Sequence, residues 1–337
     1  MEKRLYHGSA TPGIVALEPR SRLHGTAQQV VYLTDCVPYA LFYIWDEQKH
    51  GGAGKHVTAW IKDGIAHYEE QFPDQLQAFY QGVSGWLYAA EESCRAQLMP
   101  GRQNVYYASG MVTVCAAEFV PDVYERLLEY EQAGMLAIRR FREQTRERQA
   151  ELTAMMTTAV VRSGFFAGDP VQRAFMRKYF MQAWQQAVQD NIRVQAVEPG
   201  SALWDRLTAF ADGCSWIAGK HLAEMMRGNR FHAWERVFAA VCRGEIVGYC
   251  TFLETDYYPE NRYWPWISSI FVDEMFRGCR ISRQMIDTVI DYAKEQGFGR
   301  VYIPSDMTGF YEQYGFEKID ELTNYGGDVD GIFAKNI

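Results

Sequence analysis

A strand, a short loop and a long helix follow one another between residues 266 and 296, and this unit constrains the fold most. Residues 266–272 form an apolar run typical of a buried strand. Residues 301–303 predict a further strand, and Gly297 stands where a helix stop belongs. Between them, apolar residues recur at helical spacing, at Ile281, Met285, Ile286, Val289, Ile290 and Ala293.

The loop between this strand and this helix predicts an anion site. Residues 273–280 lead into the first helical turn, whose backbone N–H groups have no partner inside the helix and attract anions. Arg277 and Arg280 add positive charge there. A pyrophosphate suits such a loop. An ordinary strand–helix turn with a basic surface has the same pattern, so the residues alone leave both interpretations open.

The pattern of predicted strands and helices begins before this unit, at about residue 191. Residues 192–197 alternate in polarity, and residues 237–242 and 246–253 are apolar runs joined by Arg243-Gly244-Glu245, which predicts a tight hairpin. We therefore expect residues 191–337 to form one α/β domain with a mixed sheet and flanking helices.

Two motifs in this domain resemble a known superfamily. Residues 272–282, Val-Asp-Glu-Met-Phe-Arg-Gly-Cys-Arg-Ile-Ser, resemble the acetyl-CoA motif V-x-P-x-x-R-G-x-G-I-G/A of the GNAT N-acetyltransferases. Residues 310–316, Phe-Tyr-Glu-Gln-Tyr-Gly-Phe, resemble the F/L-Y-x-x-x-G-F signature of the same superfamily, in the same order and at a similar interval. Glu274 stands where Pro is common, Arg280 replaces a Gly, and Ser282 replaces Gly or Ala.

The resemblance implies a GNAT fold for residues 191–337 and a set of cofactor contacts. The backbone of Ile270 and Val272, with Phe271 between them, is expected to pair with the pantetheine arm of acetyl-CoA. The loop N–H groups are expected to cradle its pyrophosphate, through Arg277, Gly278, Cys279, Arg280, Ile281 and Ser282. The implied activity is transfer of the acetyl group to a primary amine by direct attack in a ternary complex.

The resemblance also implies catalytic groups. Tyr311 is expected near the thioester sulfur, where a phenol can protonate the leaving thiolate; the alternative is a packing tyrosine. A carboxylate must accept the proton of the ammonium substrate. Glu254 and Asp256, which follow strand 246–253, are the candidates, with Asp306 a third; a solvated strand end is the alternative. The acceptor is a small-molecule amine or an amine of a peptide or protein.

The N-terminal part, residues 1–120, is predicted to be a separate α+β domain. Its Tyr-His-Gly-Ser strand, a strand with Tyr32 and a helix with Tyr43 resemble the start of the ADP-ribosyltransferase fold. That resemblance implies that His7 binds the nicotinamide ribose of NAD and that Tyr32 and Tyr43 stack on nicotinamide. Glu118 is the best candidate for the fold's strand-borne glutamate. The alternative is a domain that has kept no chemistry.

Residues 121–190 predict a helical connector packed on the N-terminal domain. Pro121-Asp122 signals a helix start, and Asp169-Pro170 signals another helix that runs to about residue 188. The pattern of residues 139–156 is charged and helical, with alternating signs that favour (i, i+4) pairs on a solvated face.

Charge and cysteine usage exclude several classes of protein. The net charge of −8 over 337 residues disfavours a nucleic-acid partner, which needs a basic stripe. No apolar run approaches the ~18 residues of a membrane helix, and residues 1–9 lack the apolar part of a signal peptide. Seven cysteines without a C-x-x-C pair predict neither a disulfide framework nor a metal site, and favour a cytoplasmic location.

Two rival functions stay open at this stage. One is an ADP-ribosyltransferase-like enzyme that uses NAD, with the GNAT domain as an accessory. The other is a non-catalytic sensor in which both domains bind nucleotide-like ligands. The sequence leaves the oligomeric state open, a dimer included, and it does not identify the acceptor amine.

Overall fold

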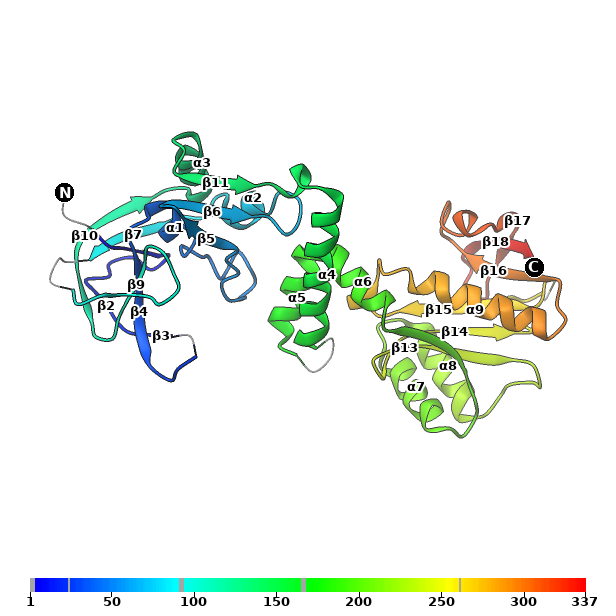
Figure 1. The fold of residues 1–337 in the computed structure, drawn as a ribbon. Helices are drawn as coiled ribbons and strands as arrows, with labels where there is room; N and C mark the ends of the chain where they lie inside the picture. Colours follow the sequence, from blue (N-terminus) through cyan, green and yellow to red (C-terminus); the bar gives the residue numbers. More distant parts are fainter. Residues whose placement is uncertain (1–3, 24, 91–93, 165–167, 261) are drawn as a thin grey trace. The chain divides into compact units, whose positions relative to one another are not determined.

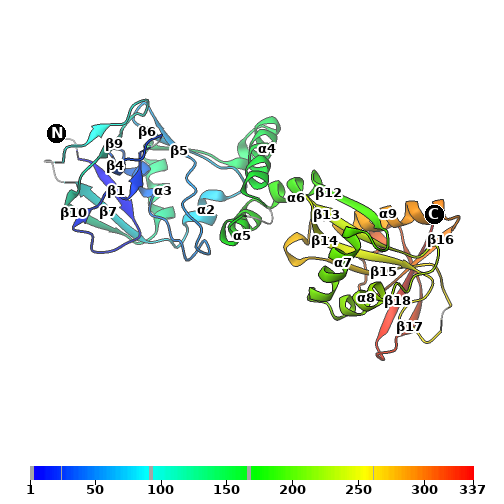
Figure 2. The same cartoon turned by 90° about the horizontal axis from the view of Figure 1, so that it is seen from below.

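The computed structural model describes residues 4–23, 25–90, 94–164, 168–260 and 262–337, and it confirms the mixed α+β class (Figure 1). The chain divides into two compact units, Met1–Trp184 and Gln185–Ile337. Each unit has sheets and helices of its own, which are visible again in Figure 2. Within the described ranges, no helix is long and apolar enough to cross a membrane.

The first unit is built on a sheet with the strand order β2-β10-β7-β1-β4-β9-β8, to which β3 is added through β4. The predicted strand that carries Tyr32 is present as β4, and Glu118 lies on a strand, β10. The strands are β1 (Tyr6–Ser9), β2 (Ala16–Leu17), β3 (Ser21–Arg22), β4 (Gln29–Thr34), β7 (Gly85–Ala90), β8 (Gln97–Leu98), β9 (Val105–Ala108) and β10 (Val112–Val120).

The glycine of the His-Gly-Ser motif lets a helix approach the main sheet closely. Helix α1 (Val37–Leu41) packs on β1, and a Cβ atom added at Gly8 would lie 2.1 Å from the carbonyl oxygen of Ala40. Only glycine leaves room for that approach. The glycine in this motif therefore has a packing role.

A smaller sheet completes the first unit, with β6 (Ile65–Glu69) between β5 (Ala59–Lys62) and β11 (Leu136–Arg139). Helices α2 (Gln75–Tyr80) and α3 (Val123–Gln132) accompany it. Helix α3 begins where the sequence predicts, because the Asp122 carboxylate accepts hydrogen bonds from the N–H groups of Tyr124 and Glu125.

The helix predicted over residues 139–156 is wrong at its start. Arg139 ends the strand β11, which pairs in parallel with β6, and a single 3-10 turn (Phe141–Glu143) follows. Helix α4 (Arg146–Ser163) begins only after Thr145, whose side chain accepts from the N–H of Arg148. The buried carboxylate of Glu70 holds this turn, because it accepts hydrogen bonds from the N–H groups of Leu76 and Phe141.

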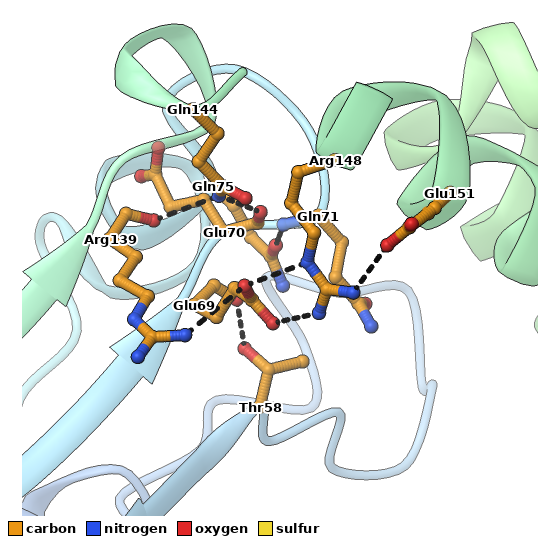
Figure 3. Close-up of polar contacts among 9 residues, drawn as sticks. All are labelled: Thr58, Glu69, Glu70, Gln71, Gln75, Arg139, Gln144, Arg148 and Glu151. Atoms are coloured by element: carbon orange, nitrogen blue, oxygen red, sulfur yellow. Dashed lines mark hydrogen bonds and ion pairs between the residues drawn. The ribbon is translucent and has the colours of Figure 1, made fainter. Parts of the chain in front are cut away.

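The charges of this segment join the helix to the small sheet instead of pairing mainly along one helix face (Figure 3). Arg148 donates to both carboxylate oxygens of Glu69 on β6, at 3.2 and 2.7 Å. It also pairs with Glu151 at 2.9 Å, while Arg139 lies 3.8 Å from Glu69. These contacts fix the start of α4 against the end of β6, which periodicity alone does not indicate.

The helix predicted after Asp169-Pro170 is two helices. Asp169 caps α5 (Pro170–Tyr179), and α6 (Met181–Gln189) follows after Phe180, whose φ of −112° and ψ of 46° lie outside the helical region. The boundary between the two units falls inside α6, between Trp184 and Gln185.

The second unit has one mixed sheet in the order β12-β13-β14-β15-β16-β18-β17. Every strand predicted for this part is present. The strands are β12 (Ile192–Val197), β13 (Arg236–Cys242), β14 (Glu245–Leu253), β15 (Trp266–Val272), β16 (Arg300–Ser305), β17 (Glu317–Thr323) and β18 (Val329–Asn336).

Helices cover both faces of this sheet. On β14, Tyr249 packs against Phe210 of α7 (Ala202–Gly213), and α8 (Ile217–Arg227) lies beside α7. Phe252 of the same strand packs against Tyr292 of α9 (Ile281–Glu295). Because residues an odd number apart on a strand face opposite sides, α7 and α8 cover one face and α9 the other.

Candidate active site

Strand β15 bends in its middle because it carries one extra residue. Tyr249 is opposite Phe271, but Thr251 is opposite Ser268, so two residues of β15 face one residue of β14. Ser269 takes up the irregularity with a φ of +49°, in the left-handed region. Such a bulge re-aims the strand that carries it.

Beyond the bulge, β15 separates from its other neighbour. Along the described residues of β15 and β16, the parallel pairing is confined to Trp266 and Tyr302. The N–H of Asp273 donates to the Val247 carbonyl on the β14 side, so by alternation the polar backbone groups of Val272 point away from β14. The edge of β15 that faces β16 can therefore accept an extended ligand as an added strand.

The loop after β15 is held by its own side chains. Asp273 caps a 3-10 turn (Glu274–Phe276) by accepting from the N–H of Met275 at 2.9 Å. Arg277 donates from Nε to the Val272 carbonyl at 3.1 Å and pairs with Glu274 at 3.0 Å. The guanidinium of Arg277 thus supports the turn, and Glu274, at the family's proline position, is its partner.

Arg280, the unusual residue of the motif, lies at the N-cap of α9 with φ +56° and ψ +25°. This left-handed conformation costs a non-glycine residue about 1–2 kcal/mol. The glycine of the family pattern avoids that cost, so the replacement is strained but structurally tolerated. The Arg280 side chain is exposed, whereas the Cys279 side chain beside it is buried.

Tyr311 lies just before a 3-10 turn (Glu312–Tyr314) and is 7% exposed. Burial raises the pKa of its phenol to about 12, although a hydrogen bond with Ser305 acts in the opposite direction. Cys250, next to the bulge, is among the neighbours that raise this pKa. A phenol in this state stays protonated and can donate a proton.

Two of the three carboxylates predicted as bases, Asp256 and Glu254, differ in their surroundings. Burial raises the pKa of Asp256, and Asp330 acts in the same direction. Its Oδ1 accepts from the N–H of Tyr257 at 2.6 Å, and its buried Oδ2 has no hydrogen-bond partner among the described residues. The side chain of Glu254 is exposed, and its backbone N–H donates to Glu235.

The acid and base candidates each lie near a residue beside the bulge, Tyr311 near Cys250 and Asp256 near Ser268. The Ser268 side chain of β15 lies near Asp256 and acts to lower its pKa, against the larger effect of burial, and the Ser268 carbonyl accepts from the Thr251 hydroxyl at 3.0 Å. Cys250, the neighbour of Tyr311, directly precedes Thr251. Sequence reasoning missed Ser268 and Asp330, because a buried serine inside an apolar strand and an aspartate 74 residues after Asp256 give no local signal.

In the first unit, three of the four residues of the predicted NAD-like site are neighbours. His7 donates from Nδ1 to the Tyr32 carbonyl at 3.0 Å. Burial and the nearby hydroxyls of Tyr39 and Tyr32 raise the pKa of Tyr43 above its usual range. The structure does not bring Glu118 to them.

The strand register explains the position of Glu118. On β7, Leu87 is opposite both Glu118 of β10 and Gly8 of β1, so Glu118 lies on the face of the sheet opposite to His7. There it pairs with Arg126 of α3 at 2.6 Å. The resemblance of this unit to the ADP-ribosyltransferase fold stays a prediction.

The comparisons with known proteins concern the second unit. The model of the Acetyltransferase (GNAT) family matches residues 200–316. This segment, which carries the bulged strand and the loop before α9, is a GNAT-family domain. An uncharacterised N-acetyltransferase, YhbS of Escherichia coli K12, is 31% identical over 74 residues. That alignment covers 22% of this chain and 44% of YhbS, so it spans less than half of the relative's length.

Two solved structures illustrate the structural matches. An acetyltransferase from Streptococcus agalactiae is 17% identical, covers 44% of this chain and 99% of its own, and has a TM-score of 0.34. A GNAT-family acetyltransferase from Elizabethkingia anophelis with acetyl-CoA bound is 19% identical, covers 44% of this chain and 99% of its own, and has a TM-score of 0.32.

Proposed function

We propose that the second unit transfers the acetyl group of acetyl-CoA to a primary amine by direct attack in a ternary complex. The observation that carries this proposal is the free edge of β15, which leads directly to the loop before α9 and has the buried Tyr311 nearby. The match of residues 200–316 to the GNAT family supports the same assignment.

In the proposed complex, the pantetheine arm lies along β15 as an added strand. Its amides pair with the outward backbone groups of Ile270 and Val272. The Val272 carbonyl already accepts from Arg277, so its N–H is the group offered to the ligand. The pyrophosphate lies on residues 277–282, named the pyrophosphate loop from here on, where N–H groups at the start of α9 favour an anion.

The proposed chemistry uses one acid and one base. Asp256, whose pKa is raised by burial, accepts the proton of the ammonium acceptor directly or through water. The amine nitrogen attacks the thioester carbon, a C–N bond forms, and the C–S bond breaks as the tetrahedral intermediate collapses. Tyr311, which burial keeps protonated, gives its proton to the leaving thiolate of CoA. The second proton, which the attacking nitrogen loses as the amide forms, returns through water to the Tyr311 phenolate, and Asp256 releases the first proton to solvent.

Product analysis tests the activity. The full chain is incubated with acetyl-CoA and a panel of primary amines that includes polyamines, aminosugars and peptides with a free N-terminus or lysine. The expected result is release of free CoA thiol that matches the amount of acetylated amine found by mass spectrometry. Thiol release without any acetylated amine, or no release with any member, would reject the transfer reaction for this panel.

The pH profile tests the base. The rate should rise with pH through the pKa of Asp256, because the carboxyl must be deprotonated to accept a proton, and this limb should lie above the ordinary aspartate value of about 3.9. Asp256→Asn should lower kcat/KM about 10²-fold or more. Glu254→Gln is the matched control and should retain activity, since the Glu254 side chain is exposed. The opposite ranking of the two variants would assign the base to Glu254.

A further inference from the structure

Helix α6 contacts the pyrophosphate loop through two glutamines, and neither motif of the superfamily includes them. Gln185 donates from Nε2 to the Gly278 carbonyl at 3.0 Å, and Gln189 donates from Nε2 to the Cys279 carbonyl. The two glutamines are four residues apart, so they lie on one face of the helix. All of these residues belong to the second unit.

A third glutamine completes this arrangement. Gln284, in the first turn of α9, donates to the Oε1 atom of Gln189 at 2.7 Å. Gln189 therefore accepts from the helix that follows the loop and donates to the loop itself. Its side-chain amide is fixed from both ends, which favours one rotamer and one orientation.

These contacts fix the direction of backbone N–H groups in the loop. In a planar trans peptide, the carbonyl and the N–H of the next residue point in opposite directions. The bond from Gln189 to the Cys279 carbonyl thus turns the N–H of Arg280 away from α6. That N–H makes no hydrogen bond within the described part of the chain, so it remains available to an anion.

The position of Arg280 explains why such support is useful. Arg280 holds a left-handed conformation without the glycine that makes it easy. Rotation of the peptide before Arg280 would relieve this strain, and its N–H would then no longer point outward. The two glutamine bonds favour the strained conformation over the relaxed one.

We propose that Gln185 and Gln189 are positioning residues that hold the pyrophosphate loop in its anion-binding conformation, so that acetyl-CoA affinity depends on helix α6. This inference rests on the proposed function, because it takes acetyl-CoA as the ligand of the loop. It goes further in that it makes the chain segment before the GNAT-family domain part of the cofactor site.

Calorimetric titration of the full chain with acetyl-CoA tests the inference. Gln185→Ala/Gln189→Ala should weaken binding about tenfold, since a ligand that must select a less populated loop conformation binds in proportion to that population. Gln186→Ala is the matched control: this residue is on the same helix, is exposed, and its side chain donates to the Asp190 carboxylate at 2.7 Å and not to the pyrophosphate loop. The control should bind as the wild type does.

Steady-state kinetics separate positioning from a general loss of structure. The double variant should raise the KM for acetyl-CoA and leave kcat at saturation close to that of the wild type, because the bound ligand restores the loop. Gln189→Glu keeps the size of the side chain but offers an oxygen to the Cys279 carbonyl. It should weaken binding in the same way, even if the double variant does not fold.

The outcomes are distinct. Weaker binding in the double variant and in Gln189→Glu, with Gln186→Ala unchanged, supports the inference. Unchanged affinity for acetyl-CoA in both the double variant and Gln189→Glu overturns the inference and leaves the proposed function intact. If the wild type itself does not bind acetyl-CoA, the proposed function fails first, and the inference fails with it.

Discussion

At the scale of single residues, Arg280 is where this chain departs most from the superfamily motif, and the structure gives that departure a physical meaning. The residue holds φ +56° at the N-cap of α9, a conformation that a side chain with a Cβ atom adopts only at a cost. The Arg280 side chain is exposed, so it does not occupy the crowded interior of the loop.

Replacing Arg280 by glycine should stabilise the second unit. Removal of the Cβ relieves about 1–2 kcal/mol of strain from the left-handed conformation. The greater conformational freedom of glycine in the unfolded chain offsets about half of this gain. Urea denaturation should show a gain of about 0.5–1 kcal/mol. Arg280→Ala keeps the Cβ and should show no such gain, so an equal gain in both variants would contradict the strain explanation.

At the scale of helices and strands, the sequence predicts the second unit well. Its helices and strands have regular spacings of apolar residues, and turn and cap residues mark where they begin and end. The strand at residues 266–272 and the helix that begins at residue 281 have the expected bounds, since alternation, glycine stops and caps are local signals. The bulge at Ser269 and the separation of β15 from β16 were not predictable. Both features depend on how β15 pairs with β14 and β16, and the local sequence does not indicate this pairing.

Prediction in the connector failed for a related reason. Residues 139–144 carry charges that resemble a helix face, but pairing of β11 with β6 and the buried Glu70 carboxylate override that preference. In the candidate site, Tyr311 and the loop were named from the motifs. Ser268 and Gln189 act through contacts with distant segments, so only the three-dimensional structure reveals them.

The contact between β1 and α1 yields a prediction for the first unit. Gly8→Ala would add a Cβ atom 2.1 Å from the Ala40 carbonyl oxygen, so α1 must shift. We expect a loss of about 1–3 kcal/mol in the free energy of unfolding of this unit, measured by urea denaturation. Gly54→Ala is the control, because a Cβ there meets nothing within 4 Å. Equal stability of the two variants would remove the packing role assigned to Gly8.

At the scale of the whole molecule, the chain forms two compact units, and a buried histidine, His50, lies inside the first. His50 is 3% exposed. It donates from Nε2 to the Phe79 carbonyl, and its Nδ1 accepts from the Tyr179 hydroxyl. Burial lowers the pKa of His50 from 6.5 to about 4. The contact links α5 to the α+β part of the same unit.

The lowered pKa predicts that the first unit loses stability in acid. Between pH 6.5 and about 4 the unfolded chain binds a proton at His50 that the folded chain does not. The contribution of His50 to the free energy of unfolding is therefore fully present above pH 6.5. It falls by at most about 3 kcal/mol as the pH is lowered toward 4. His50→Gln should flatten this slope in urea titrations, whereas the exposed His221→Gln should not. His7 and His56, whose pKa values burial also lowers, should leave a residual slope.

The most direct test of the account is the turnover of the Tyr311→Phe variant. This change keeps the buried ring and removes only the hydroxyl that is proposed to protonate the CoA thiolate. We predict that kcat falls about 10²-fold. The KM for acetyl-CoA should stay near the wild-type value. Tyr314→Phe, in the 3-10 turn that follows Tyr311, should retain the wild-type rate. Wild-type turnover in Tyr311→Phe across the pH range would contradict the central claim.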